Sequence, residues 1–250
     1  MKSNKNKINI FCCTFVIAIA CAICAVVFPY NNKIYASDIT RPDITKASVQ
    51  DDYFCLKDYY RIDTPCQASM GTCWIFSFTK TLETNLAITT GEYYDFSEAW
   101  LTLCVKVENS SYEIGAGGHQ TNCFNVAKKY GLLLETEFPY EYALGFDDNN
   151  YLQIYNMYKG LAHSYIPSDI SYTNFANTKW VEKSDKILNT KAYLLKNGAI
   201  STNINDSEFQ SINGRSCTYS EKVLNHSVTI IGWDDNLSFN DSNGILRQGV

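Results

Sequence analysis

The chain has 250 residues, of which 46% are hydrophobic and 19% are charged, and its formal net charge at pH 7 is −5. This length and composition are sufficient for one sizeable domain or two lobes with a buried core, and they exclude a disordered chain. The first 36 residues carry lysines and no acidic residue, so the remainder is more acidic than the whole. Because no basic stripe is present, we expect no nucleic-acid partner.

The amino terminus resembles an export signal. Lysines precede an apolar run from Ile10 to Phe28, and a polar stretch follows it. The run has about 19 residues, longer than a usual signal-peptide core and close to the length that spans a bilayer. Residues 1–36 are therefore predicted to be a signal peptide cleaved after Ala36 or, alternatively, an uncleaved anchor. We expect the rest of the protein to be secreted or membrane-anchored outside the cytoplasm, with membrane contact through this segment alone.

The first half of the remaining chain is predicted to be helical. Residues 37–52 lack apolar periodicity, which predicts a short mobile lead-in. From Trp74 to Leu86 apolar residues recur every three or four positions, which predicts a helix with one buried stripe. Residues 97–104 predict a second helix that begins after the capping residue Ser97. The sequence "GAGG" at 115–118 predicts a sharp loop before a third helix.

The second half changes character. The third helix should end at Gly131, and residues 141–180 predict long loops with short helices. Residues 188–195 predict another helix. Two short, turn-bounded segments rich in β-branched residues predict strands, at 199–204 and 226–233. A helical front half followed by a strand-bearing back half indicates an α+β protein of two lobes.

Six cysteines lie after the amino-terminal segment: Cys55, Cys66, Cys73, Cys104, Cys123 and Cys217. In an oxidising compartment thiols are expected to pair, whereas a nucleophilic thiol must stay single. No C-x-x-C pair matched by a second such pair occurs among them, so we predict no zinc site and no other cofactor.

Several ordered segments between about Tyr53 and Asp234 resemble the papain-like cysteine peptidases. They are "QASMGTCW" at 67–74, "FSEAWLTLC", "GAGG", "FPYEY" and "NHSVTIIGWDD". The resemblance implies an α+β, papain-like two-lobe fold for residues 53–250, with a helical lobe and a β-barrel-like lobe. It also implies protein or peptide substrates, and we expect a monomer.

The resemblance assigns roles residue by residue. Cys73 matches the nucleophile, His226 the general base and Gln67 the donor to the oxyanion. The positions implied to bind substrate are Gly117, Gly118, His119, Gln120, Leu224 and Asn225. Gln120 and Leu224 match the pocket for the side chain two residues before the scissile bond, and a polar Gln120 argues against the usual hydrophobic preference. No residue is assigned to a metal.

Elementary chemistry agrees with these roles. A free thiol has a pKa of about 8.5, which a helix amino terminus and a neighbouring imidazolium can lower to roughly 3–4. Cys73 stands at the predicted helix start, and His226 lies about 150 residues downstream, a spacing similar to that between cysteine and histidine in papain-like peptidases. The amide of Gln67 and the backbone N–H of Cys73 could stabilise an oxyanion together.

The chain departs from the family at three places. Met70 and Gly115 stand where family members commonly carry a disulfide, so this bridge is expected to be lost. Cys104 matches a half-cystine whose usual partner is missing, which leaves pairing with Cys123 or a free thiol. The sequence reaches Val250 without the N-S-W-G motif whose asparagine orients the histidine, and we expect a fragment with an incomplete second lobe. The leading hypothesis is an exported cysteine endopeptidase; the alternative is a non-catalytic surface or binding protein of this fold, or an inactive fragment.

Overall fold

The computed structural model describes residues 43–165, 183–212, 215–217, 223–241 and 243–249. The chain divides into two units, Met1–Asn32 and Lys33–Val250, and all described residues belong to the second. Within these ranges no helix combines the length and the apolar character needed to cross a membrane. The apolar run of the amino terminus lies outside the described residues, so its role stays a prediction.

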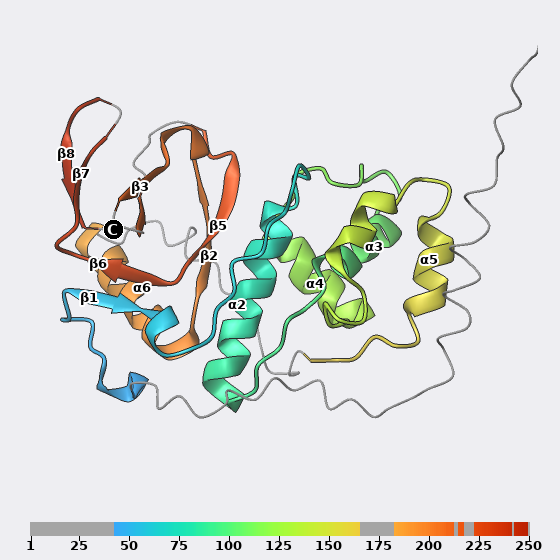
Figure 1. The fold of residues 1–250 in the computed structure, drawn as a ribbon, viewed down its shortest axis with the longest axis horizontal. Coiled ribbons are helices and arrows are strands. Elements are labelled where there is room, and N and C mark those ends of the chain that lie inside the picture. The colour runs from blue at the N-terminus through green and yellow to red at the C-terminus, as the bar shows by residue number, and fades with distance from the viewer. Residues whose placement is uncertain (1–42, 166–182, 213–214, 218–222, 242, 250) are drawn as a thin grey trace, which may run out of the picture. The chain divides into compact units, whose positions relative to one another are not determined.

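Helices make up the first part of the described chain (Figure 1). They are α2 (Cys73–Thr90), α3 (Glu98–Glu108), α4 (Gln120–Tyr130), the 3-10 turn η3 (Tyr140–Gly145) and α5 (Tyr151–Tyr158). The three long helices confirm the predictions from periodicity. The expectation of loops with short helices over 141–180 is met as far as residue 165, and residues 166–182 lie outside the described part.

Local sequence signals set the ends of these helices. Ser97 caps α3, because its hydroxyl accepts a hydrogen bond of 2.9 Å from the backbone N–H of Trp100. Gly91 ends α2 with a φ of +73°, and Gly131 ends α4 with a φ of +76°. A left-handed residue after the last helical turn is readily supplied by glycine, which has no Cβ to clash. The predicted end at Gly131 is thus confirmed.

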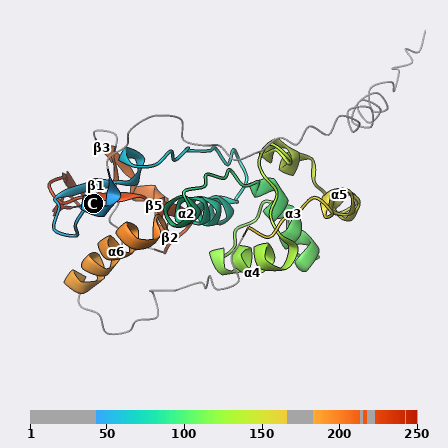
Figure 2. The same cartoon turned by 90° about the horizontal axis from the view of Figure 1, so that it is seen from below.

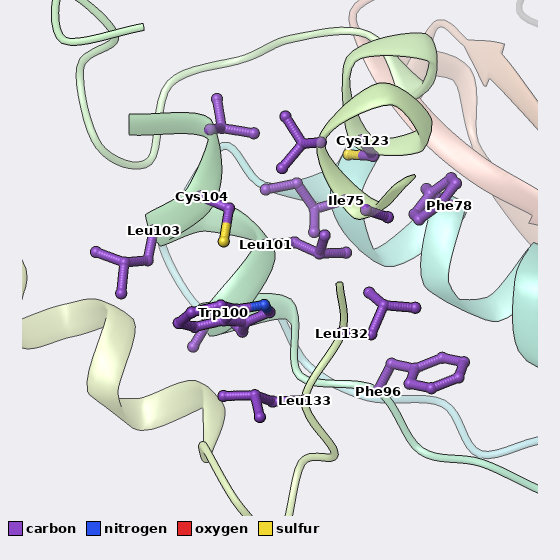
Figure 3. Packing of buried hydrophobic residues seen from close by; sticks show 14 of the residues in the cluster. Ile75, Phe78, Phe96, Trp100, Leu101, Leu103, Cys104, Cys123, Leu132 and Leu133 are labelled. Atoms are coloured by element: carbon purple, nitrogen blue, oxygen red, sulfur yellow. The ribbon is translucent and has the colours of Figure 1, made fainter. Parts of the chain in front are cut away.

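The helical core contains two of the cysteines (Figure 3). Trp100 is fully buried, and its ring packs edge-on against Phe138 at a centroid distance of 5.9 Å. Cys104 and Cys123 are also fully buried, and both are free thiols. Burial raises the pKa of each thiol, so they stay protonated and act as small apolar side chains. Of the two options for Cys104, the structure therefore supports the free thiol.

Strands form the second part of the described chain, together with β1, which precedes α2. They are β1 (Tyr53–Cys55), β2 (Ile200–Ile204), β3 (Gln210–Ile212), β4 (Arg215–Cys217), β5 (His226–Ile230), β6 (Gly232–Asp234), β7 (Ser238–Asn240) and β8 (Leu246–Gln248). They pair antiparallel as β1–β6, β2–β5, β3–β4 and β7–β8. The helix α6 (Lys183–Asn197) lies beside these strands and next to α2 (Figure 2). The side-chain amide of Asn85 joins the two helices by donating to the carbonyl of Asn197 at 2.9 Å.

The prediction of a single strand over 226–233 is wrong. β5 pairs with β2, and after Ile231 the chain changes partner so that β6 pairs with β1. Gly232 stands opposite Cys55, and a Cβ on it would lie 2.2 Å from the carbonyl oxygen of Phe54. The change of partner brings the two backbones too close for any other residue, as strand glycines often indicate.

The end of the predicted lead-in is packed against this second part. Residues 43–52 include the short turn η1 (Ile44–Lys46), in contrast to the expected mobile segment. The indole N–H of Trp233 donates to the carbonyl of Asp51 at 2.8 Å, and the backbone N–H of Asp235 donates to Asp52 at 2.7 Å. These bonds extend the β1–β6 pairing toward the amino terminus and explain why residues 43–52 are ordered.

Candidate active site

The helix that begins at Cys73 contacts the strand that begins at His226. The hydroxyl of Ser77, one turn after Cys73, donates to the carbonyl of Val228 at 2.7 Å and also bonds the hydroxyl of Ser201. Ser77 is buried, and Val228 is two residues from His226 on β5. These hydrogen bonds fix the register between α2 and β5. Sequence reasoning missed Ser77, because it lies on the side of α2 away from the predicted apolar stripe of Ile75, Phe78, Leu82 and Leu86.

A cavity of about 940 Å³ brings the predicted catalytic residues together. Gln67, Cys73 and His226 all line it, and they come from the loop before α2, the first residue of α2 and the first residue of β5. Residues separated by more than half of the chain therefore face one space. A nucleophile, a base and an amide donor are the groups that acyl transfer requires.

Cys73 occupies the amino terminus of an 18-residue helix. The first backbone N–H groups of such a helix have no intrahelical partner, and its dipole favours a negative charge at this end. Thr72, which precedes Cys73, makes no side-chain capping bond. Cys73 therefore stands where unpaired backbone N–H groups are available to a bound or developing negative charge.

Two hydrogen bonds restrain the loop from Gln67 to Gly71. The side-chain amide of Gln67 donates to the carbonyl of Met70 at 2.8 Å, and the N–H of Gly71 donates to the carbonyl of Gly115 at 2.6 Å. An amide nitrogen carries two N–H groups, so one is used in the loop and the second can serve a ligand in the cavity. The loop thus leaves one amide N–H of Gln67 available to the cavity that Cys73 also lines.

Packing replaces the disulfide that the sequence predicted to be lost. A Cβ on Gly115 would lie 3.1 Å from the terminal carbon of Met70, so the thioether rests against this glycine. Gly115 has a φ of +85°, a conformation in which side chains are disfavoured. An apolar contact and the hydrogen bond at Gly71 therefore join the two loops where a covalent bridge would stand.

The glycine loop lies against the tryptophan that follows Cys73. The indole N–H of Trp74 donates to the carbonyl of Ala116 at 3.2 Å, and a Cβ on Gly118 would lie 2.6 Å from the indole ring. Gly117, Gly118 and His119 are exposed. The loop therefore packs on Trp74, the residue that follows Cys73.

The structure places the other predicted substrate-binding residues around the histidine strand. Gln120 is only 6% exposed, and its amide donates to Asn203 and to the hydroxyl of Ser227, both at 3.1 Å. Leu224 is 55% exposed. The side chain of Asn225 bonds Asp206 of the short turn η5 (Asp206–Glu208), donating to its carboxylate at 2.6 Å. None of the six predicted positions is among the residues that line the cavity itself.

Known proteins are similar to this chain in sequence. A family model described as papain family cysteine protease matches residues 62–241. Cathepsin F of Drosophila melanogaster is 28% identical over 67% of this chain and 25% of its own length. The probable cysteine protease RD19B of Arabidopsis thaliana is 33% identical over 67% of this chain and 44% of its own length. The chain thus spans less than half of the length of these curated relatives.

A solved structure shares the fold. It contains the cysteine protease and lectin-like domains of Cwp84, a surface layer associated protein of Clostridium difficile. The TM-score is 0.55 at 23% identity, and the match covers 82% of this chain and 44% of the other. The family match extends over most of the described residues and includes Gln67, Cys73 and His226. The chain belongs to the papain family of cysteine proteases.

Proposed function

We propose that the protein is an exported cysteine endopeptidase that cleaves peptide bonds with Cys73, His226 and Gln67. The observation that carries the proposal is that all three side chains line one cavity. The position of Cys73 at the amino terminus of α2 supports its role, because the helix dipole and the unpaired backbone N–H groups at this end favour negative charge.

Each group then has a defined task, and His226 acts first as an acid and then as a base. The Cys73 thiolate attacks the carbonyl carbon of the substrate, and the protonated His226 gives its proton to the leaving amine. Water attacks the resulting thioester, with His226 as the base that removes its proton. The second amide N–H of Gln67 and the backbone N–H of Cys73 donate to the oxyanion in both steps. One such donor contributes about 2.7–4 kcal/mol in reactions where it has been removed.

The substrate preference is proposed to be less hydrophobic than is usual for the family. Gln120, Asn203 and Ser227 form a hydrogen-bonded group, in which the Ser227 hydroxyl donates to Asn203 at 2.7 Å. Ser227 follows His226 directly and lines the cavity. A polar group beside the histidine supports a subsite that accepts hydrogen-bonding side chains two residues before the scissile bond.

The test combines a point variant with a chemical label. Cys73→Ala should abolish peptide cleavage while the melting temperature stays near that of the parent, because the thiol contributes chemistry more than packing. Cys66→Ser is the matched control, since it removes an exposed thiol from the same loop and should retain activity. Iodoacetamide at mildly acidic pH should label Cys73 ahead of the other thiols, as mapped by peptide mass spectrometry.

The label also separates the peptidase from the alternative function. A non-catalytic surface or binding protein of this fold would show no preferential labelling of Cys73 and no cleavage. Cleavage by Cys73→Ala at the parental rate would show that another residue is the nucleophile.

A further inference from the structure

The hydroxyl of Tyr140 bonds both ends of the loop that carries Gln67. It donates to the backbone carbonyl of Gln67 at 3.1 Å, and it lies 2.6 Å from the hydroxyl of Thr72. A phenol has one proton, so Thr72 must donate to Tyr140 while Tyr140 donates to Gln67. The hydroxyl oxygen of Tyr140 therefore links Gln67, which carries the proposed amide donor, to Thr72, which precedes Cys73.

The loop from Gln67 to Gly71 adopts a conformation that contacts from outside the loop must hold. Ala68 has a φ of +53°, the only positive value for a non-glycine residue in the described part of the chain. Such a conformation is disfavoured for a side chain with a Cβ and persists only where surrounding contacts impose it. Ala68 and Ser69 are exposed, so packing at the loop tip supplies little restraint. The bond from Tyr140 reaches the carbonyl directly before Ala68.

Tyr140 is itself firmly held. Its ring packs edge-on against Phe76 at a centroid distance of 4.7 Å, and its backbone N–H donates to the carboxylate of Glu135 at 2.6 Å. Burial raises the pKa of Tyr140, so its hydroxyl keeps the donated proton at neutral pH. Tyr140 does not line the cavity, which means that it acts from behind the loop.

From this geometry we infer that Tyr140 is a positioning residue, which holds the amide of Gln67 at the oxyanion site through the loop backbone. The inference rests on the proposed peptidase function. An oxyanion donor is effective only when it is fixed before the charge develops, because reorganisation during the reaction would consume the stabilisation. Tyr140 should therefore influence turnover more than substrate binding.

The experiment compares Tyr140→Phe with Tyr142→Phe in the parent protein. Phenylalanine keeps the contact with Phe76 and removes the hydroxyl alone. Tyr142 is 44% exposed, and its ring packs on Phe138, so it controls for the loss of a phenol two residues away. Tyr140→Phe should lower kcat roughly tenfold to a hundredfold, with KM within about threefold, as expected for a small displacement of a reacting group. Tyr142→Phe should change neither.

Two further readouts isolate the route through Gln67. Because alkylation by iodoacetamide forms no oxyanion, the labelling rate of Cys73 should stay within about threefold in Tyr140→Phe. Adding Gln67→Ala to Tyr140→Phe should give a kcat close to that of Gln67→Ala alone, since the two residues would act through one group. A melting curve checks that each variant is folded at the assay temperature.

The outcomes are distinct. Equal kcat for Tyr140→Phe and the parent would overturn the inference and leave the peptidase proposal standing. If the labelling rate of Cys73 fell as much as kcat in Tyr140→Phe, the route through Gln67 would be overturned. The same would follow if the loss of kcat in the double variant equalled the product of the losses in Tyr140→Phe and Gln67→Ala. A parent protein that neither cleaves peptides nor labels at Cys73 would overturn the proposed function and this inference with it.

Discussion

Ser77→Ala tests whether the hydrogen bonds between α2 and β5 set the register of the proposed catalytic residues Cys73 and His226. The change removes the donor to the Val228 carbonyl at 2.7 Å and the bond to the hydroxyl of Ser201. Ser77 itself is buried, whereas Val228 and Ser201 are half-buried. Leaving a buried polar group without a partner costs about 1–3 kcal/mol. Since water can reach part of these partners, we expect a loss of about 1–2 kcal/mol in the free energy of unfolding.

That loss is a measurable part of the net stability of a domain, which is about 5–15 kcal/mol. Urea unfolding followed by circular dichroism would give its size. Thr81→Ala is the matched control, because the hydroxyl of Thr81 donates at 2.8 Å to the backbone carbonyl of Ser77 within the same helix. Removing a bond inside the helix should cost less than about 0.5 kcal/mol and should leave the register of β5 unchanged.

Ser77→Ala should also reduce activity. Val228 is two residues from His226 on the same strand, so a shift of β5 moves the imidazole relative to Cys73. A displacement near 1 Å can lower a rate by about a hundredfold, and we expect at least a tenfold fall in kcat and in the labelling rate of Cys73. A variant that is less stable but retains both rates would refute the role of Ser77 in positioning, and would leave it a purely structural residue.

Two further predictions concern stability. Burial, and secondly the charge of Glu83, raise the pKa of Glu98 to about 8 from an ordinary value of 4.5. The folded chain therefore binds the proton more tightly, and this stabilisation is complete below about pH 4.5 and is lost as the pH rises through about 8. Glu98→Gln should flatten the fall in melting temperature between about pH 5 and 8. Glu108→Gln, an exposed change on the same helix, should leave that fall unchanged. An equal dependence of melting temperature on pH in both variants would contradict the raised pKa of Glu98. Gly118→Ala should lower the free energy of unfolding by about 1–3 kcal/mol, because its Cβ would overlap the indole next to it, while Gly117→Ala, which meets no atom within 4 Å, should be neutral; equal melting temperatures would refute the overlap.

Local patterns in the sequence were sufficient to predict the helices. The buried stripe from Trp74 to Leu86, the cap at Ser97 and the glycine at 131 are signals within a few residues of the structure that they specify. The position of Cys73 at a helix start was predicted for the same reason, since helix ends depend on neighbouring residues. The ordered motifs also indicated the papain-like fold, which the family match confirms.

Contacts between distant residues were decided only by the tertiary structure. The division of 226–233 into β5 and β6 depends on pairing with β1, which lies near the other end of the described chain. The hydrogen bond between Ser77 and Val228 joins residues 151 positions apart, and that between Tyr140 and Gln67 joins residues 73 positions apart. In neither pair does the local sequence around one residue indicate which distant residue it bonds. The sequence alone determined which chemical groups were available and where α2, α3 and α4 lie. The folded chain determined which groups share a cavity, because burial and pairing depend on every element packed around them.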